Sequence, residues 1–179
     1  MDRITNFPLL DETGQEIASS LEEINNSMGD YIASNNPYYA YLEDRKIGTL
    51  LSTEITKVRD YALYKSESLI AIDLPKCTNV GERSFFLCTA LSKIIFQKIK
   101  IMKARAFQDC SNLETLVIKN DTEVCVMWGE GTTDALSGTK IESGNGYIYV
   151  PDKLVQQYKS SYSWVKYANQ IKPLSEYTE

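Results

Sequence analysis

Hydrophobic positions recur in the middle of the chain with a 22-residue period. Three segments, which begin at Leu69, Leu91 and Leu113, share the pattern apolar-x-x-apolar-x-apolar. A second set of apolar or small residues precedes each segment at fixed distances: Val58, Ala62, Leu63 and Ser66; Val80, Ser84, Phe85 and Cys88; Met102, Ala106, Phe107 and Cys110. The alternation within each segment predicts a short strand. A unit of this length cannot bury its own apolar face, so the repeats are expected to stack as the coils of a solenoid.

The period lies within the range of leucine-rich repeats, so the fold class predicted is an α/β repeat, a short leucine-rich-repeat solenoid with short stacked strands. Each strand is expected to point its apolar positions inward, while Phe85 and Phe107 enter the core from the opposite wall and stack in one column. The segment Ile47-x-x-Leu50 is a degraded copy of the strand pattern, one period before Leu69. We therefore expect an atypical edge repeat at residues 40–57.

An amphipathic helix is predicted before the repeats. Thr13-Gly14-Gln15-Glu16 matches a capping box, in which the Thr and Glu side chains satisfy the first backbone amides of a helix. The residues that follow at the alternating 4 and 3 spacing of a coiled coil are Ile17, Leu21, Ile24, Met28 and Tyr31. This stripe could pack on the open end of the solenoid or drive self-association as a homo-oligomer. Pro37 ends the helix, so residues 1–36 form an N-terminal acidic arm.

The region after the repeats is predicted to be a helical cap. Residues 37–146 are assigned to the repeat array, whose last stretch contains glycines 129, 131, 138, 144 and 146 and is expected to be loose. Tyr147–Val150 alternates as a strand does, and Pro151 with Asp152 can start a helix. Ser163 could cap a second helix that includes Ile171. Residues 147–179 are therefore expected to cover the last repeat.

Charge and composition exclude several classes of function. The part of the chain up to Ala40 contains seven acidic residues and one arginine, a net charge of −6, so the remainder carries +1 of the total of −5. A nucleic-acid partner is not expected, because it would need a basic surplus. No apolar run is long enough for membrane insertion. The start of the chain lacks the basic and apolar regions of a secretory (Sec) signal peptide.

Catalytic chemistry is not expected. The chain has no histidine, the commonest general base and metal ligand. Its four cysteines, at 77, 88, 110 and 125, have neither a C-x-x-C pair nor a histidine for zinc, and two of them share one repeat position. They are interpreted as buried thiols that pack as small hydrophobic groups. No cofactor and no metal is predicted, and the chain is expected not to be an enzyme.

Candidate binding residues lie between the buried positions of the strands. Side chains alternate across a strand, so the outward positions on the strand face are Ala71, Asp73, Lys93, Ile95, Thr115 and Val117. Of these, Asp73, Lys93, Ile95, Thr115 and Val117 form the predicted partner-binding face, with Ile95 and Val117 as an exposed apolar step. Solenoids commonly bind through such a surface.

The repeat units resemble a known family. Val80-Gly81-x-x-Ser84-Phe85-x-x-Cys88 and Ala106-Phe107-x-x-Cys110-Ser111-Asn112-Leu113 look like BspA-type leucine-rich repeats, found in bacterial surface proteins and in some phage and protozoan proteins. The segment from Gly146 to Ile171 is similar to the terminal cap of such arrays. The first segment, Phe7 to Ile17, resembles small proteins encoded in phage tail-fibre regions.

The resemblance implies a non-enzymatic module for protein recognition or adhesion. Its partner would be a host or structural protein, or a glycan, and its location extracellular, on a cell surface or on a virion. The alternative is a phage or prophage tail or virion-associated structural protein that oligomerises through the N-terminal helix.

Overall fold

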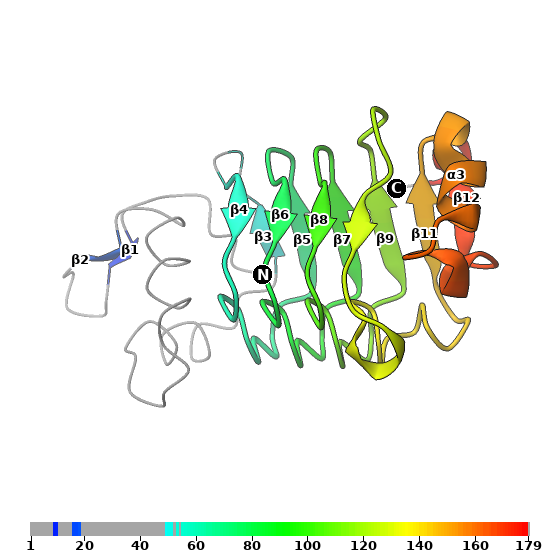
Figure 1. The fold of residues 1–179 in the computed structure, drawn as a ribbon. Helices are drawn as coiled ribbons and strands as arrows, with labels where there is room; N and C mark the ends of the chain where they lie inside the picture. Colours follow the sequence, from blue (N-terminus) through cyan, green and yellow to red (C-terminus); the bar gives the residue numbers. More distant parts are fainter. Residues whose placement is uncertain (1–8, 11–15, 19–48, 52, 54, 179) are drawn as a thin grey trace.

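The chain folds as a solenoid with two parallel sheets on opposite sides of one core (Figure 1). The structure is a computed structural model that describes residues 9–10, 16–18, 49–51, 53 and 55–178. The six-stranded sheet, in the order β12-β11-β9-β7-β5-β3, contains β3 (Thr49–Leu51), β5 (Ala71–Leu74), β7 (Lys93–Phe96), β9 (Thr115–Ile118), β11 (Tyr147–Val150) and β12 (Ile171–Pro173). The four-stranded sheet, in the order β10-β8-β6-β4, contains β4 (Lys57–Val58), β6 (Asn79–Val80), β8 (Ile101–Met102) and β10 (Val126–Met127).

The register of the strands confirms the predicted repeat. Ile72 pairs with Ile94, and Ile94 pairs with Leu116, each one period further along the chain. The edge repeat is confirmed as well, because Leu50 of β3 pairs with Ile72 of β5. On the opposite wall the rings of Phe85 and Phe107 stack, with centroids 5.1 Å apart and planes inclined by 9°. Equivalent side chains therefore form continuous columns through the core.

Three successive coils reverse through turns that each contain two non-glycine residues with positive φ. They occupy equivalent positions in successive coils: Tyr61, Arg83 and Arg105 at the first, and Lys65, Leu87 and Asp109 at the second. The left-handed region is unfavourable for residues with a Cβ. Hydrogen bonds between coils compensate for this conformational cost. Every second amide of the turn donates to a carbonyl of the next coil, as in the 2.8 Å bond from the Phe85 amide to the Ala106 carbonyl.

The glycine-containing stretch after β10 forms one further coil instead of a loose connection. The Phe107 amide donates to the Ala135 carbonyl as the Phe85 amide does to Ala106. Leu136 thus takes the place of Phe107 in the buried column, and Gly138, with φ +75°, takes the left-handed position of Asp109. This coil is longer than the others, since Thr115 of β9 pairs with Tyr147 of β11.

The C-terminal cap has less helix than predicted. After β11 come η2 (Asp152–Leu154), α3 (Val155–Ser160), η3 (Val165–Tyr167), β12 and η4 (Leu174–Glu176), and η1 (Gly131–Thr133) precedes them. The second predicted helix is wrong: η3 is a single 3-10 turn whose N-cap is Trp164 and not Ser163, and Ile171 begins a strand. The backbone hydrogen-bonding groups of β12 are satisfied by pairing with β11, so this segment does not need helical hydrogen bonds.

The cap closes the edge of the four-stranded sheet with side chains. The Cys125 amide donates to the Tyr158 hydroxyl, and Trp164 Nε1 donates to the Cys125 carbonyl. Both aromatic rings are fully buried against the last coil. Polar atoms of the cap thus satisfy a strand edge that would otherwise be open to another chain.

The predicted N-terminal helix is wrong where the structure describes it. Glu16–Ala18 is strand β2, paired antiparallel with strand β1 (Leu9–Leu10), so Ile17 lies in a strand. Strand pairing with β1 thus takes the place of the predicted helical hydrogen bonds at Glu16–Ala18. Leu21, Ile24, Met28 and Tyr31 lie outside the described residues, so self-association through them stays a prediction. No helix in the described part is long and apolar enough to cross a membrane.

Candidate functional site

The predicted apolar step on the six-stranded sheet is not exposed. Val117 has no exposed surface and Ile95 is only 9% exposed. Asp73, Lys93 and Thr115 are partly buried. The prediction that Ile95 and Val117 face solvent is therefore wrong, although the structure does bring all five residues together on three neighbouring strands. Whether a partner binds this face stays a prediction.

The C-terminal segment covers these side chains. The centroids of the Tyr177 and Tyr149 rings lie 5.1 Å apart, and Lys93 Nζ lies 5.2 Å from the centroid of the Tyr177 ring. Lys93 is on β7 and Tyr149 on β11, so the Tyr177 ring crosses the intervening strand β9, which carries Val117. The Ser175 amide donates to Asp152 Oδ1 at 3.0 Å and fixes the return of the chain. The sequence indicates the alternation of β9, but it does not indicate that a segment about 60 residues further along the chain packs on this face.

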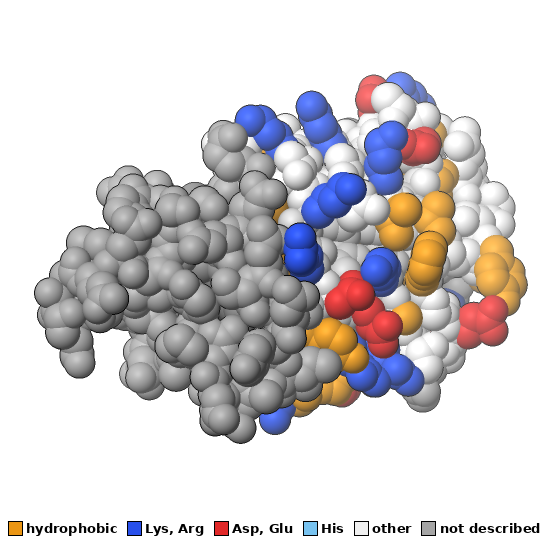
Figure 2. All heavy atoms as spheres, turned by 60° about the vertical axis from the view of Figure 1, so that its left-hand side comes forward, with side chains coloured by type: hydrophobic (Ala, Val, Ile, Leu, Met, Phe, Trp, Pro, Cys, Tyr) orange, Lys and Arg blue, Asp and Glu red, His pale blue; other side chains and the backbone are white. Residues whose placement is uncertain are grey.

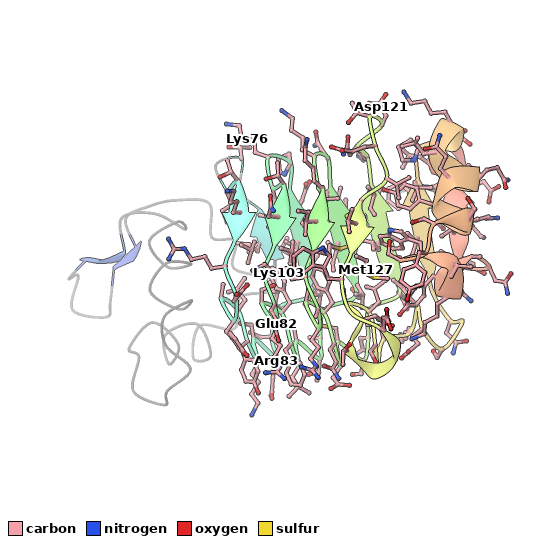
Figure 3. All side chains as sticks on the ribbon, in the orientation of Figure 1. Lys76, Glu82, Arg83, Lys103, Asp121 and Met127 are labelled. Atoms are coloured by element: carbon pink, nitrogen blue, oxygen red, sulfur yellow. The ribbon has the colours of Figure 1, made fainter. Side chains whose placement is uncertain are left out.

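The outer face of the four-stranded sheet is the more accessible surface. We call it the small-sheet face, and its outward positions, in strand order, are Lys57 and Arg59, Asn79, Ile101 and Lys103, Val126 and Trp128. Figure 3 shows Lys103 and Met127 on this sheet, between Lys76 and Asp121 at one rim and Glu82 and Arg83 at the other. Sequence reasoning missed the face because its strands have only two residues each, too short for an alternation to be recognised.

One half of the small-sheet face is apolar. Val126 is 48% exposed and Trp128 is 51% exposed, and Val126 pairs with Ile101 on the adjacent strand. The Trp128 amide donates to the Met102 carbonyl at 2.8 Å, which holds its backbone in the extension of β10. Figure 2 shows a group of hydrophobic side chains beside lysines and arginines on this side of the molecule. A half-exposed tryptophan on a hydrogen-bonded strand is a rigid apolar contact surface.

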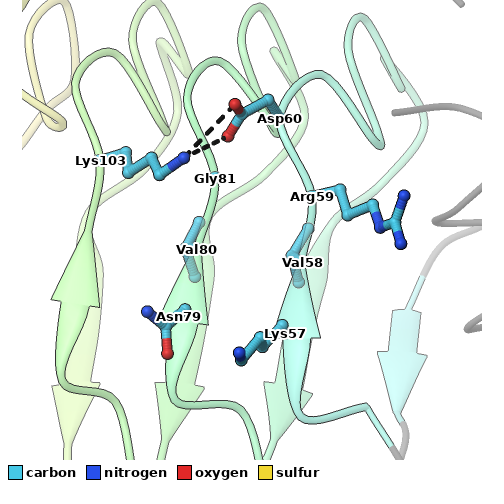
Figure 4. Close-up of a pocket in the computed structure, with 8 residues that line it drawn as sticks. All are labelled: Lys57, Val58, Arg59, Asp60, Asn79, Val80, Gly81 and Lys103. Atoms are coloured by element: carbon cyan, nitrogen blue, oxygen red, sulfur yellow. Dashed lines mark hydrogen bonds and ion pairs between the residues drawn. The ribbon is translucent and has the colours of Figure 1, made fainter. Parts of the chain in front are cut away.

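The other half is a hollow of about 360 Å³ over β4 and β6, with both charged and apolar residues in its lining (Figure 4). Its described lining includes Lys57, Arg59, Asn79 and Lys103 around Gly81. The glycine is required by close approach, because a Cβ there would lie 2.4 Å from the carbonyl carbon of Arg59. The backbones of neighbouring coils therefore pass close together at this part of the hollow, which the Lys57, Arg59 and Lys103 side chains also line.

Charges in the hollow are unequally compensated. Lys103 Nζ lies 3.1 Å from Asp60 Oδ1, and the Glu82 amide donates to the same oxygen at 2.8 Å. Asp60 is thus held by a cation and a backbone donor. Lys57 and Arg59 are exposed and make no ion pair within the part of the chain that the structure describes. In Figure 4 the Arg59 side chain points away from Gly81, beyond the edge strand. The surplus charge at this end of the face is positive.

An ionic cluster around the buried Asp134 joins the cap to the last coil. Lys166 bonds to Asp134 Oδ2 at 2.7 Å and to Glu142, and Tyr167 donates to Asp134 Oδ1 at 2.7 Å. Burial, together with the Asp134 and Glu142 charges, raises the pKa of Tyr167. Burial alone would lower the pKa of Lys166, but the hydrogen bonds and charges of Asp134 and Glu142 outweigh it and raise that pKa. These groups satisfy one another, so we assign the cluster to structure.

The four cysteines pack inside the coils. All four are buried and free, as predicted. Cys88 and Cys110 donate to the Leu63 and Phe85 carbonyls of the preceding coil, at 3.1 and 2.9 Å. Burial raises the pKa of Cys77 to about 12 and raises that of Cys110 well above its usual value. Thiolates are the nucleophilic form, so these side chains act as packing groups.

Comparison with protein-family models agrees with the geometry of the coils. Residues 39–126 match the model of the BspA type leucine-rich repeat region, in six copies. The repeat array is of the BspA leucine-rich type. Repeats of this type suggest a protein-interaction module and are generally non-enzymatic. Searches of curated proteins and of solved structures gave no match.

Proposed function

We propose that this BspA-type protein is a non-enzymatic recognition module that binds a partner protein through the small-sheet face. The observation that carries the proposal is the exposed apolar group of Val126 and Trp128 on a hydrogen-bonded edge strand. Tryptophan is enriched among the residues that dominate binding energy at protein interfaces. The strands and columns beneath it hold the backbone in place, so little conformational entropy is lost on binding.

The small-sheet face is favoured over the six-stranded sheet for a physical reason. On the six-stranded sheet Val117 is fully buried and the Tyr177 ring lies against Tyr149 of the neighbouring strand, so a partner would first have to displace the C-terminal segment. On the small-sheet face the apolar side chains are already open. Adhesion at a cell surface and assembly into a virion are two settings in which such display would act, and the proposal for the binding face is the same in both.

The experiment compares partner capture by three immobilised proteins. These are the wild type, the Val126→Ser/Trp128→Ser variant, and a Tyr147→Ser control, which removes an exposed aromatic side chain from the other sheet. Proteins extracted from the organism and its surroundings are captured and quantified by mass spectrometry. We expect a set of proteins retained by the wild type and the control and depleted at least tenfold on the double variant, since truncating a central anchor costs about 2 kcal/mol or more. Equal capture by all three would contradict the proposal.

A further inference from the structure

The small-sheet face has a cationic end and an apolar end, which together specify the chemistry of a binding segment. Lys57 and Arg59 lie on or next to β4, and Trp128 follows β10, at opposite edges of the four-stranded sheet. Between them lie the hollow over Gly81 and the neutralised pair of Lys103 and Asp60. No acidic side chain of the described residues pairs with Lys57 or Arg59, although the whole chain has a net charge of −5.

Resting on the binding face proposed above, we infer that the partner presents an extended acidic segment that lies across the strands. In this arrangement one acidic side chain meets Lys57 and Arg59, and one large apolar side chain packs on Val126 and Trp128. The exposed Arg59 guanidinium can offer paired donors to a carboxylate. The hollow, about 360 Å³ and lined in part by Asn79 and Lys103, lies where the backbone of the segment would pass between the two contacts.

The spacing of the sheet sets the spacing of the segment. The backbone positions of Arg59 and Trp128 are separated by three strand intervals, about 14 Å at the usual distance between neighbouring strands. An extended chain covers about 3.4 Å per residue, so four residues span nearly the same length. Side chains four apart in an extended segment point to the same side. An acidic residue and a large apolar residue at positions i and i+4 therefore fit the face, whereas the same pair on a helix would be only about 6 Å apart.

The test is a selection from a random peptide library displayed on phage, against the full-length chain. The wild type is compared with Lys57→Glu/Arg59→Glu, with Val126→Ser/Trp128→Ser, and with the Tyr147→Ser control. All substituted side chains are exposed, and circular dichroism with a thermal melt verifies that each variant is folded. The most enriched peptides are then synthesised, and their dissociation constants are measured by fluorescence anisotropy at about 0.15 M salt.

We expect the wild type and the control to enrich peptides with an acidic and a large apolar residue four positions apart. Their dissociation constant should rise about tenfold on Lys57→Glu/Arg59→Glu, because two attractive contacts become repulsive. Peptides that depend on Trp128 but bind equally well to the charge-reversed variant would overturn this inference and leave the proposed function standing. Peptides that bind the Val126→Ser/Trp128→Ser variant as well as the wild type, or no enrichment at all, would count against both.

Discussion

Truncation of the stacked aromatic column tests the physical basis of the fold. Phe107 has no exposed surface, stacks on Phe85 at 5.1 Å and contacts Phe96 at 6.4 Å between ring centroids. Phe107→Ala removes a fully buried ring, which costs about 1.5–3 kcal/mol in transfer free energy. The cavity left between two coils raises the total to about 3–5 kcal/mol. This is a large fraction of the roughly 5–15 kcal/mol that stabilises a domain.

The matched control is Phe86→Ala, the same substitution on the adjacent, partly exposed column. Phe86 stacks on Tyr64 with ring centroids 5.3 Å apart, but solvent reaches it from one side. Its loss should cost only about 1 kcal/mol, the typical value of an aromatic pair.

Urea unfolding, followed by far-UV circular dichroism and by the fluorescence of the buried Trp164, gives the free energy of unfolding of each variant. Since a loss of 1 kcal/mol lowers the melting temperature of a chain of this size by about 2–4 °C, Phe107→Ala should lower it by roughly 6–20 °C. A loss for Phe107→Ala no greater than that for Phe86→Ala would refute the argument that inter-coil columns carry the stability.

Three further outcomes are expected. Gly81→Ala should lower the free energy of unfolding by more than about 2 kcal/mol, because the new Cβ would meet the Arg59 backbone. Gly131→Ala, whose Cβ would have nothing within 4 Å, should lower it by only about 1–2 kcal/mol through left-handed strain. Equal losses for the two variants would exclude close approach as the cause. The pKa of Cys77 in the folded chain, about 12, is raised above the ordinary 9.0, so the contribution of this thiol to stability is complete below pH 9 and is lost as the pH rises toward 12. The midpoint of urea denaturation should therefore be steady up to pH 9 and fall above it. A fall that begins below pH 9 would point to other groups. Tyr177→Ser should uncover the apolar face at Val117 and increase the fluorescence of the dye ANS, and unchanged dye binding would show that Tyr177 does not cover it.

The sequence by itself determined the coils. A constant period with fixed apolar offsets specifies which residues share a column, because each coil contacts mainly its neighbours and the same environment repeats. Ile72, Ile94 and Leu116 could therefore be placed in one register, and Phe85 and Phe107 in one stack, from the sequence alone. The edge repeat at β3 followed from the same offsets even though its pattern was degraded.

Only the tertiary structure decided which surfaces stay open. The alternation of β9 places Val117 on the outer side of its strand, but Val117 is fully buried, and Tyr177, near the end of the chain, packs on the same face against Tyr149, a contact that no local pattern encodes. Conversely, Trp128 and Val126 lie on or next to a strand of two residues, and about half of each side chain stays exposed in the folded chain. Burial on a solenoid face is set by segments that lie outside the period, so the repeat fixes the frame, and contacts distant in sequence fix the binding surface.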